Sequence, residues 1–424
     1  MSKKKNPEVQ SPLANLIKTI QPANLISLYP LNERNGIRAY DVNKRIPAGQ
    51  YQNVALNNAV GPDGASNAAF FNGASSVVNI FQSDFATYFS PTQATVVVHA
   101  KVASSSVWTD GVNHEILRLL VDGSNWILVR KTTTNNQITG FYNAGAVSKS
   151  AAYVTSAPTG WFAIGFTVDK ANDICRLWID GSPVTFFTAL GTWSGNLTTE
   201  SIGAGGGLWW SGWLANMSIW SMALTGPDIA LASNRTGFVA FDGDSRSVNT
   251  FEATCMADAA LSTKRLGWDY YAVSGQRASE LNNDVSTQIT PLFRSRLINN
   301  VVVVWAGIND GVNGATAAQI WSALQTYCTT VRAAGQKVVL CTEIDGQSAA
   351  LNTAGWHGTI YPTLNTSIRA GWSSVADALA DLGNNANLQD ATNTTYFNAD
   401  KVHLTTAGYN IVAGIVAAAI ASIT

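Results

Sequence analysis

Charged residues are scarce in this sequence, and neither sign of charge is in excess. Only 12% of the 424 residues are charged, about half of the roughly 25% that is usual for globular proteins. The 26 basic and 27 acidic residues leave a net charge of -1, which excludes a strongly basic nucleic-acid-binding protein and a polyanionic tail. The polar surface must therefore come mainly from Asn, Ser and Thr, a mixture typical of β-rich or extracellular proteins.

Cysteine motifs, long apolar runs and a secretion signal are lacking as well. The four cysteines have no CxxC spacing, so they indicate neither a zinc knuckle nor a redox pair, and we expect them to be buried. The sequence has no run of about 18 apolar residues, so it does not predict a membrane span. The basic N-terminus, Met1–Lys5, is followed by no apolar signal core. We expect an extracellular or virion-associated protein with no signal peptide in this chain.

Three stretches of the sequence differ in pattern. Residues 1–22 are polar with a short apolar repeat of helical spacing, and we expect an N-terminal arm there. Residues 23–224 predict an all-β sandwich, because many short strand-like runs are separated by turn signals such as Asp180-Gly181. Residues 225–237 predict a short connector. The strand-like runs of the sandwich include residues 94–100, 115–121, 126–129, 161–168 and 175–179.

Residues 238–424 alternate between short apolar runs and helical patterns. The apolar runs, which predict strands covered on both faces, are Phe238–Phe241, Tyr270–Val273, Val301–Trp305 and Val338–Cys341. The helical patterns are residues 279–297, 317–334, 364–382 and 405–423. This alternation predicts an α/β domain whose parallel sheet has helices on both faces.

Short polar motifs follow three of these predicted strands at the point where each strand ends. They are Gly243-Asp244-Ser245, Ser274-Gly275 and Gly307-Ile308-Asn309-Asp310. Because the carboxyl ends of parallel strands lie on one edge of a sheet, where ligands bind, we expect these motifs to converge. A fourth motif, Asp400-Lys401-Val402-His403, precedes the last helix, and its loop must bring it to the same edge.

The residue types in these motifs fit a serine nucleophile. A serine hydroxyl is a weak nucleophile until a neighbouring base takes its proton. His403 is the obvious base because the chain has only four histidines, and Asp400 can orient its ring. The backbone N–H groups of Ser245 and Gly275 and the side-chain amide of Asn309 are candidate donors to a developing oxyanion.

The four motifs, in this order, resemble the signature blocks of the SGNH (GDSL) serine hydrolase superfamily, and the resemblance covers residues 238–424. It implies a three-layer α/β fold with a flavodoxin-like parallel sheet. It implies Ser245 as nucleophile, His403 as base and Asp400 as its orienting acid. Ser245, Gly275 and Asn309 would form the oxyanion hole. The superfamily includes lipases, thioesterases, arylesterases and carbohydrate deacetylases, so the resemblance implies a reaction type and not a substrate.

Residues beside the motifs have less specific interpretations. We expect Asp244 and Asp310 to be structural carboxylates. Arg246, Trp356 and His357 are candidate substrate contacts, although for His357 we favour a solvated loop histidine. Because no long insertion separates the motifs, we expect an open site rather than a lidded tunnel.

The β part resembles laminin-G-like, concanavalin A-like jelly rolls over residues 24–225. The resembling segments are residues 26–33, 69–74, 176–181 and 213–225. Members of this fold often bind sugars or proteins, which implies a glycan ligand for the sandwich. Trp209 and Trp210, beside a glycine run, are the candidate sugar-stacking residues, whereas we expect Trp213 to lie in the core. No cluster of Asp and Glu residues has the spacing of calcium ligands.

Together these patterns predict a serine esterase that needs no metal or other cofactor. Our leading hypothesis is a carbohydrate esterase that deacetylates an acylated glycan, with the lectin-like domain holding the polymer near the site. One alternative is a receptor-binding or adhesion component of a phage tail or secreted assembly that carries an esterase. Another is a general lipase, lysophospholipase or arylesterase. The glycan, the acyl group and the oligomeric state stay open.

Overall fold

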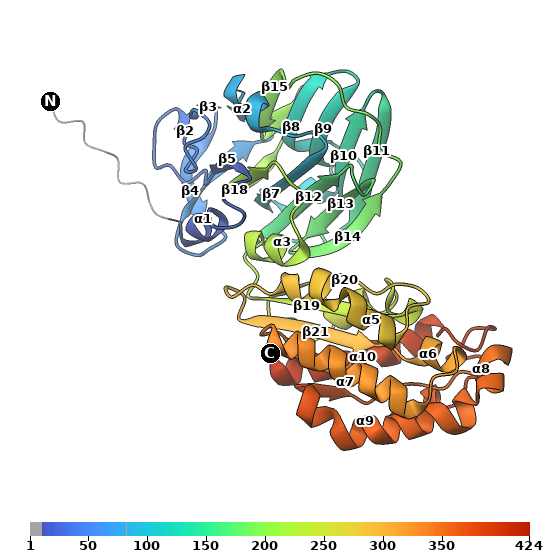
Figure 1. Ribbon diagram of the computed structural model, residues 1–424. Coiled ribbons are helices and arrows are strands. Elements are labelled where there is room, and N and C mark those ends of the chain that lie inside the picture. The colour runs from blue at the N-terminus through green and yellow to red at the C-terminus, as the bar shows by residue number, and fades with distance from the viewer. Residues whose placement is uncertain (1–10, 82) are drawn as a thin grey trace. The chain divides into compact units, whose positions relative to one another are not determined.

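The computed structural model describes residues 11–81 and 83–424, and the chain divides into two compact units (Figure 1). The sandwich unit extends to Asn234, and the α/β unit runs from Arg235 to Thr424. Residues 1–10 of the expected arm lie outside the described residues. Of the remainder, Pro12–Ile17 form helix α1, whose N-cap is Ser11 and whose side chains Leu13, Ala14 and Ile17 are buried, so this segment is part of the sandwich fold.

Two antiparallel sheets of eight strands each build the sandwich unit. The strands of the first sheet are β1 Leu25–Tyr29, β4 Ala55–Val60, β5 Asn67–Asn72, β7 Gln93–Val102, β12 Phe162–Asp169, β13 Ile174–Ile179, β14 Ser182–Phe187 and β18 Ser211–Trp220. Those of the second are β2 Arg38–Ala39, β3 Gly49–Gln52, β6 Val77–Asn79, β8 His114–Asp122, β9 Asn125–Lys131, β10 Gln137–Ala144, β11 Val147–Val154 and β15 Thr199–Ile202. A hairpin and short helical segments complete the unit: β16 Ala204–Gly205, β17 Leu208–Trp209, α2 Ser83–Tyr88, η1 Ser105–Trp108 and α3 Gly226–Ala232.

The two sheets share one apolar core. The first sheet has the order β14-β13-β12-β7-β18-β5-β4, with β1 beside β18, and the second has the order β11-β10-β9-β8-β15-β6-β3-β2. Val98 and Ile164 of the first sheet lie in the same buried cluster as Ile127 and Ile138 of the second. Alternate residues of the central strands β7 and β12 lie in this cluster, as the period of two requires. The predicted β-sandwich is confirmed.

Five parallel strands form the sheet of the α/β unit. They are β19 Gly237–Gly243, β20 Leu266–Tyr270, β21 Asn299–Trp305, β22 Lys337–Cys341 and β23 Ala378–Ala380. Their order, β20-β19-β21-β22-β23, is the flavodoxin-like one, and its switch point lies between β19 and β21. The predicted α/β fold with a flavodoxin-like sheet is confirmed.

Helices cover both faces of this sheet. They are α4 Glu252–Met256, α5 Ala278–Asp284, α6 Ile308–Val312, α7 Ala317–Ala333, α8 Ala349–Ala354, α9 Tyr361–Val375 and α10 Thr406–Ile423. Short turns add η2 Ser245–Ser247, η3 Val285–Ile289, η4 Thr290–Leu292, η5 Trp356–Ile360, η6 Leu382–Asn384 and η7 Ala386–Leu388. Helices α4 and α10 pack together, and α7 packs between α5 and α9.

Three predicted elements of this unit are wrong in their bounds. The second strand lies earlier than Tyr270–Val273, because β20 buries Leu266 and Trp268. The predicted helix 279–297 is split into α5, η3 and η4, and Pro291, which lacks an N–H, lies in the last of these turns. The predicted helix 364–382 ends at Val375, and the chain then extends to form the edge strand β23.

Helix α10 is long and apolar enough to cross a membrane by length and composition alone. Its side chains Val412, Val416 and Ile420, however, lie in the buried apolar cluster beneath the sheet. The core helix of a soluble protein passes the same test of length and composition. The four cysteines are free and buried, as the sequence predicts.

Candidate active site

Ser245 follows β19 in the tight turn η2, at the carboxyl edge of the sheet. Gly243 has a φ of 143°, and a Cβ there would lie 2.0 Å from the carbonyl oxygen of Trp305, so only glycine fits this strand end. Asp244 is the N-cap of η2, and its Oδ1 accepts the backbone N–H of Arg246 at 3.0 Å. These constraints hold Ser245, which is half-buried, at the end of the strand.

Three of the predicted side chains meet at this point. The Oγ of Ser245 lies 2.8 Å from Nε2 of His403, and Nδ1 of His403 lies 2.7 Å from Oδ2 of Asp400. A carboxylate can only accept, so the ring carries its proton on Nδ1 and leaves Nε2 as the acceptor for the serine hydroxyl. This arrangement can take a proton from Ser245.

The loop before α10 holds His403 in place through its own backbone. Asn398 donates its N–H to the carbonyl of His403 at 2.8 Å, and Phe397 pairs with Leu404 in an isolated β-bridge. Lys401 adopts a left-handed conformation with a φ of 58°, which turns the chain between Asp400 and His403. Thr405 then caps α10, so the helix start fixes the end of the loop.

Asp400 is ionised in this arrangement. Partial burial acts to raise its pKa, but hydrogen bonds from the His403 ring and from the N–H groups of Val402 and His403 outweigh burial and hold the pKa below its usual value. The side chains of His403 and Asp400 are 36% and 49% exposed, so the site is open to solvent.

Asn309 and the loop after β20 supply the other predicted donors. Asn309 is the second residue of α6, and its Nδ2 donates to the carbonyl of Gln276 at 3.0 Å. The amide has two N–H bonds, so one stays available for an oxyanion. Gly275, the neighbour of Gln276, has a φ of 81° and open space where a Cβ would stand. The hydrogen bond thus joins the Asn309 turn to the Gly275 loop, and sequence reasoning missed Gln276.

Asp310 has the structural role that the sequence predicts. Its Oδ2 accepts the N–H of Ala278 at 2.6 Å, and its Oδ1 accepts the N–H and hydroxyl of Ser279 at 3.2 and 3.0 Å. These groups lie at the first turn of α5, where backbone N–H groups have no helical partner. Asp310 therefore ties α6 to the start of α5.

Two predicted substrate contacts are wrong. Arg246 is 0% exposed, because its guanidinium is enclosed by Asp244 and Glu343. Trp356 is also 0% exposed; its Nε1 donates to the carbonyl of Ile344 at 3.2 Å, and its ring occupies the space above Gly311. Neither side chain reaches a ligand at the surface.

His357 stays a candidate for contact with substrate. Its side chain is half-exposed, and its Nδ1 lies 2.7 Å from Oδ1 of Asp345, whose side chain is fully buried. Gln347, two residues beyond Asp345, donates its N–H to the carbonyl of Lys401 at 3.0 Å. The loop after β22 is therefore attached to the loop that carries Asp400 and His403.

In the sandwich unit, the predicted sugar platform is only partly exposed. Trp210 is 0% exposed, and its Nε1 donates to the carbonyl of Trp213, which corrects its assignment as a sugar contact. Trp209 is half-exposed. Trp213 is not in the core as expected: it is half-exposed, its Nε1 donates to Asn58 at 2.9 Å, and the Nζ of Lys101 lies 5.1 Å from its ring centre.

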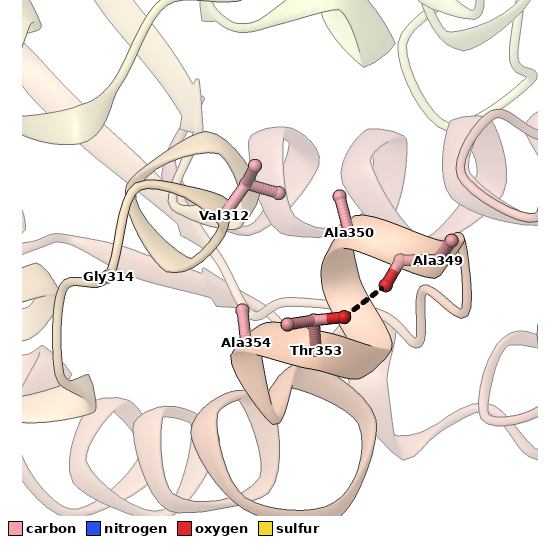
Figure 2. Close-up of a pocket in the computed structure, with 6 residues that line it drawn as sticks. All are labelled: Val312, Gly314, Ala349, Ala350, Thr353 and Ala354. Atoms are coloured by element: carbon pink, nitrogen blue, oxygen red, sulfur yellow. Dashed lines mark hydrogen bonds between the residues drawn. The ribbon is translucent and has the colours of Figure 1, made fainter.

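A surface groove of about 460 Å³ lies between α6 and α8 (Figure 2). It is lined by Val312, Gly314, Ala349, Ala350, Thr353 and Ala354. The hydroxyl of Thr353 donates to the carbonyl of Ala349 at 2.9 Å, so the side chains offer an apolar surface. Val312 follows Asn309 by three residues, about 4.5 Å of helix rise, so the groove begins within one turn of the Asn309 amide. Nothing in the sequence pattern predicted it.

Comparison with known protein families finds a match for most of the α/β unit. Residues 243–411 match the GDSL-like lipase/acylhydrolase family. The match spans all four sequence motifs and confirms the resemblance of the C-terminal half to GDSL hydrolases. It supports an ester hydrolase of the esterase or lipase type in this GDSL-like unit. No curated protein matches the sequence of the chain.

Several solved structures are distantly similar to the chain. Domain 4 of AbnA, an extracellular arabinanase from Geobacillus stearothermophilus, solved with arabinotriose, is 17% identical, with a TM-score of 0.41 over 50% of this chain and 98% of that one. The receptor binding domain of botulinum neurotoxin C/D mosaic serotype is 14% identical, with a TM-score of 0.41 over 49% of this chain and 50% of that one. The botulinum neurotoxin serotype D binding domain is 16% identical, with a TM-score of 0.38 over 49% and 51%. The similarity thus spans about half the length of the neurotoxin chains.

Proposed function

We propose that the chain is a serine ester hydrolase whose nucleophile is Ser245. The observation that carries this proposal is the chain of two hydrogen-bond distances, 2.8 Å from Ser245 to His403 and 2.7 Å from His403 to Asp400. In the first step, the Oγ of Ser245 attacks the ester carbonyl carbon while Nε2 of His403 takes its proton. The N–H groups of Ser245 and Gly275 and the amide of Asn309 stabilise the resulting oxyanion.

The rest of the reaction uses the same groups. The imidazolium of His403 gives its proton to the leaving alcohol, which departs and leaves an acyl group on Ser245. His403 then takes a proton from a water molecule, which attacks the acyl carbon, and Ser245 regains its hydroxyl as the carboxylic acid leaves. Asp400 stabilises the imidazolium in both halves because it is ionised.

The substrate that we propose first is an acetylated glycan. A bulky polymer needs a site that is open at the surface, and the half-exposed His403 and Asp400 supply one. The side chain of His357 is 49% exposed and is held by Asp345 through Nδ1, so its other ring nitrogen can bond a sugar hydroxyl. This substrate assignment rests on these surface features and on the lectin-like architecture of the sandwich unit.

A second candidate is an esterase for longer acyl chains, and the groove between α6 and α8 favours it (Figure 2). A mainly apolar lining offers few partners for sugar hydroxyls, whereas a hydrocarbon chain needs none. A volume of about 460 Å³ exceeds what an acetyl group needs. The groove therefore suits an acyl chain that leaves the ester carbonyl along α6.

The sandwich unit is proposed to bind glycan, either for the esterase or as the main role of an adhesion component. Trp126 and Arg130 alternate along β9 with core residues, so their side chains lie on the outer face of the sheet. The ring centre of Phe141, on β10, lies 6.1 Å from that of Trp126 and 4.6 Å from Cζ of Arg130. Both rings are half-exposed, and aromatic faces of this kind stack on sugars.

One experiment tests the hydrolase and ranks its substrates. Purified full-length protein is assayed on acetylated oligosaccharides and on simple esters of increasing acyl length, beside Ser245→Ala. We expect Ser245→Ala to lose nearly all turnover while keeping its fold and its glycan binding. An acetate preference favours the deacetylase, and a preference for longer chains favours the second candidate. Turnover that survives Ser245→Ala overturns the hydrolase proposal, and full biological activity of that variant favours adhesion.

A further inference from the structure

Directly after the nucleophile, Arg246 carries a charge that solvent does not reach. Its side chain and that of Asp244 are 0% exposed, and Glu343 is 1% exposed. Nε and Nη2 of Arg246 donate to Asp244 at 3.0 and 2.7 Å, and Nη1 and Nη2 donate to Glu343 at 2.6 and 3.0 Å. Its Cζ lies 4.4 Å from the centre of the Trp305 ring.

Burying this charged cluster costs more free energy than filling the same space with apolar side chains. A buried charge is unfavourable unless it is paired, and apolar side chains of similar volume often give equal or greater stability than a buried ion pair. The cluster also holds two carboxylates for one guanidinium, and burial raises the pKa of Glu343 against the opposing effect of Arg246. Stability alone therefore gives a weak reason for these residues.

The cluster joins the carboxyl ends of three neighbouring strands. Asp244 follows β19, Trp305 is the last residue of β21, and Glu343 lies two residues beyond β22. The backbone of Glu343 is itself fixed, because its N–H and carbonyl exchange hydrogen bonds of 2.8 Å each with the side chain of Asn365 on α9. The guanidinium of Arg246 is therefore paired with a carboxylate whose backbone is held in place.

The same carboxylate lies close to the turn that carries the oxyanion donor. Gly307 is the N-cap of α6, two residues before Asn309, and a Cβ there would lie 3.0 Å from Oε1 of Glu343. Glu343 therefore lies between the backbone of the Ser245 turn, which Arg246 holds, and the backbone of the Asn309 turn. A shift of the Ser245 turn would move the guanidinium, and a shift of Gly307 toward Glu343 would displace its carboxylate.

We propose that Arg246 and Glu343 are positioning residues that set the distance between the Ser245 hydroxyl and the Asn309 amide. The inference rests on the proposed hydrolase function. The fork of the guanidinium fixes two carboxylates in one plane, which a lysine ammonium cannot do. A misplacement of a catalytic group by about 1 Å can lower the rate about 10²-fold. A small change in this cluster can therefore lower the rate although the cluster does not contact the substrate.

The test uses Arg246→Lys and Glu343→Gln in the full-length protein. Reactive sites are counted with a fluorophosphonate, in which the Ser245 oxygen displaces fluoride from phosphorus as His403 takes the hydroxyl proton. We expect kcat per reactive site to fall about 10²-fold in each variant, with KM nearly unchanged, because only the transition state needs the exact spacing. The rate of labelling should fall in parallel.

A matched control separates positioning from stability. Arg369 forms a partly exposed pair with Asp381 at 2.8 Å in the same unit, so Arg369→Lys makes the same chemical change outside the four motifs and should leave kcat unchanged. Wild-type kcat per reactive site in Glu343→Gln, with only a lower Tm, overturns the proposal. So does failure of both variants to fold. Wild-type protein that neither turns over esters nor labels at Ser245 instead refutes the hydrolase function itself.

Discussion

Oδ2 of Asp400 lies 2.7 Å from Nδ1 of His403, three residues later in the same loop. Oδ1 of the same carboxylate accepts the backbone N–H groups of Val402 and His403 at 2.9 and 3.0 Å. One oxygen therefore builds the loop and the other orients the ring. Asp400 therefore both holds the loop and orients the His403 ring, and a substitution can separate these two roles.

Asp400→Asn should keep the loop and impair the reaction. An amide oxygen can still accept the two N–H groups, but the neutral side chain neither favours the correct ring tautomer nor stabilises the imidazolium, so we expect kcat to fall on the order of 10²- to 10⁴-fold. The measurement is kcat across pH. Because the pKa of Asp400 lies below its usual value, Asp400 should not supply the acid limb of the wild-type profile.

Asp258→Asn is the matched control for this change. Asp258 also accepts, at 2.8 Å, the N–H of the residue two positions later, Ala260, but it lies outside the four motifs. Its variant should have wild-type kcat. A fall in kcat of less than threefold for Asp400→Asn, with the loop intact, would show that Asp400 does not orient the base.

Asn309→Ala should remove one oxyanion donor. We expect a loss on the order of 10²–10³ in kcat, because the donor acts on charge that develops only in the transition state. The exposed Asn384→Ala supplies the control and should be neutral. If kcat for Asn309→Ala stays within tenfold of wild type, the amide is not part of the hole.

Filling the groove should change the acyl-length profile. Ala350 is exposed on α8 and lines the groove, so Ala350→Trp adds a large side chain there without disturbing the core. We expect turnover of hexanoate esters to fall at least tenfold relative to acetate esters, since the longer chain loses its place. Ala370→Trp, on the exposed side of α9, should leave the ratio unchanged. An unchanged ratio in Ala350→Trp would place the acyl chain elsewhere.

The sequence predicted the motifs well because each depends on short-range chemistry. Gly243 and Gly275 mark backbone that needs positive φ, and Asp400 and His403 are neighbours in one loop. Burial, in contrast, depends on partners far along the chain. Arg246 looked like a substrate contact because Glu343, 97 residues away, is visible beside it only in the fold. Glu343 itself follows a predicted strand, as the recognised motifs do, and that position was its available signal.

The sequence did not predict short edge elements, for a related reason. The strand Ala378–Ala380 has only three residues, too few for a pattern of its own, and it forms because Asp377 pairs with Val338: its N–H donates to the Val338 carbonyl and its carboxylate accepts the Val338 N–H, each at 2.8 Å. Trp210 was expected at the surface because it lies beside a glycine run, and Trp356 was a candidate substrate contact. Both are buried because each Nε1 finds a backbone carbonyl, which lets a large ring enter the core.

Glu252 should make the stability of the protein depend on pH. The residue is 0% exposed at the start of α4, and burial raises its pKa to about 7, although the N–H of Thr250 opposes the shift. Between pH about 4.5 and 7 the unfolded chain releases this proton while the folded protein keeps it. The free energy of unfolding should therefore fall by about 3 kcal/mol as pH rises through that window, and the contribution should be level above it.

Glu252→Gln removes this contribution, since an amide does not titrate. Urea unfolding at pH 4.5 and pH 8 should show a smaller loss of stability in the variant than in the wild type, with the variant the more stable of the two at pH 8. Glu280→Gln is the control, because Glu280 is partly exposed, pairs with Arg277, and has a pKa below its usual value. Equal pH dependence in the wild type and Glu252→Gln would show that the Glu252 carboxyl is not held protonated by the fold.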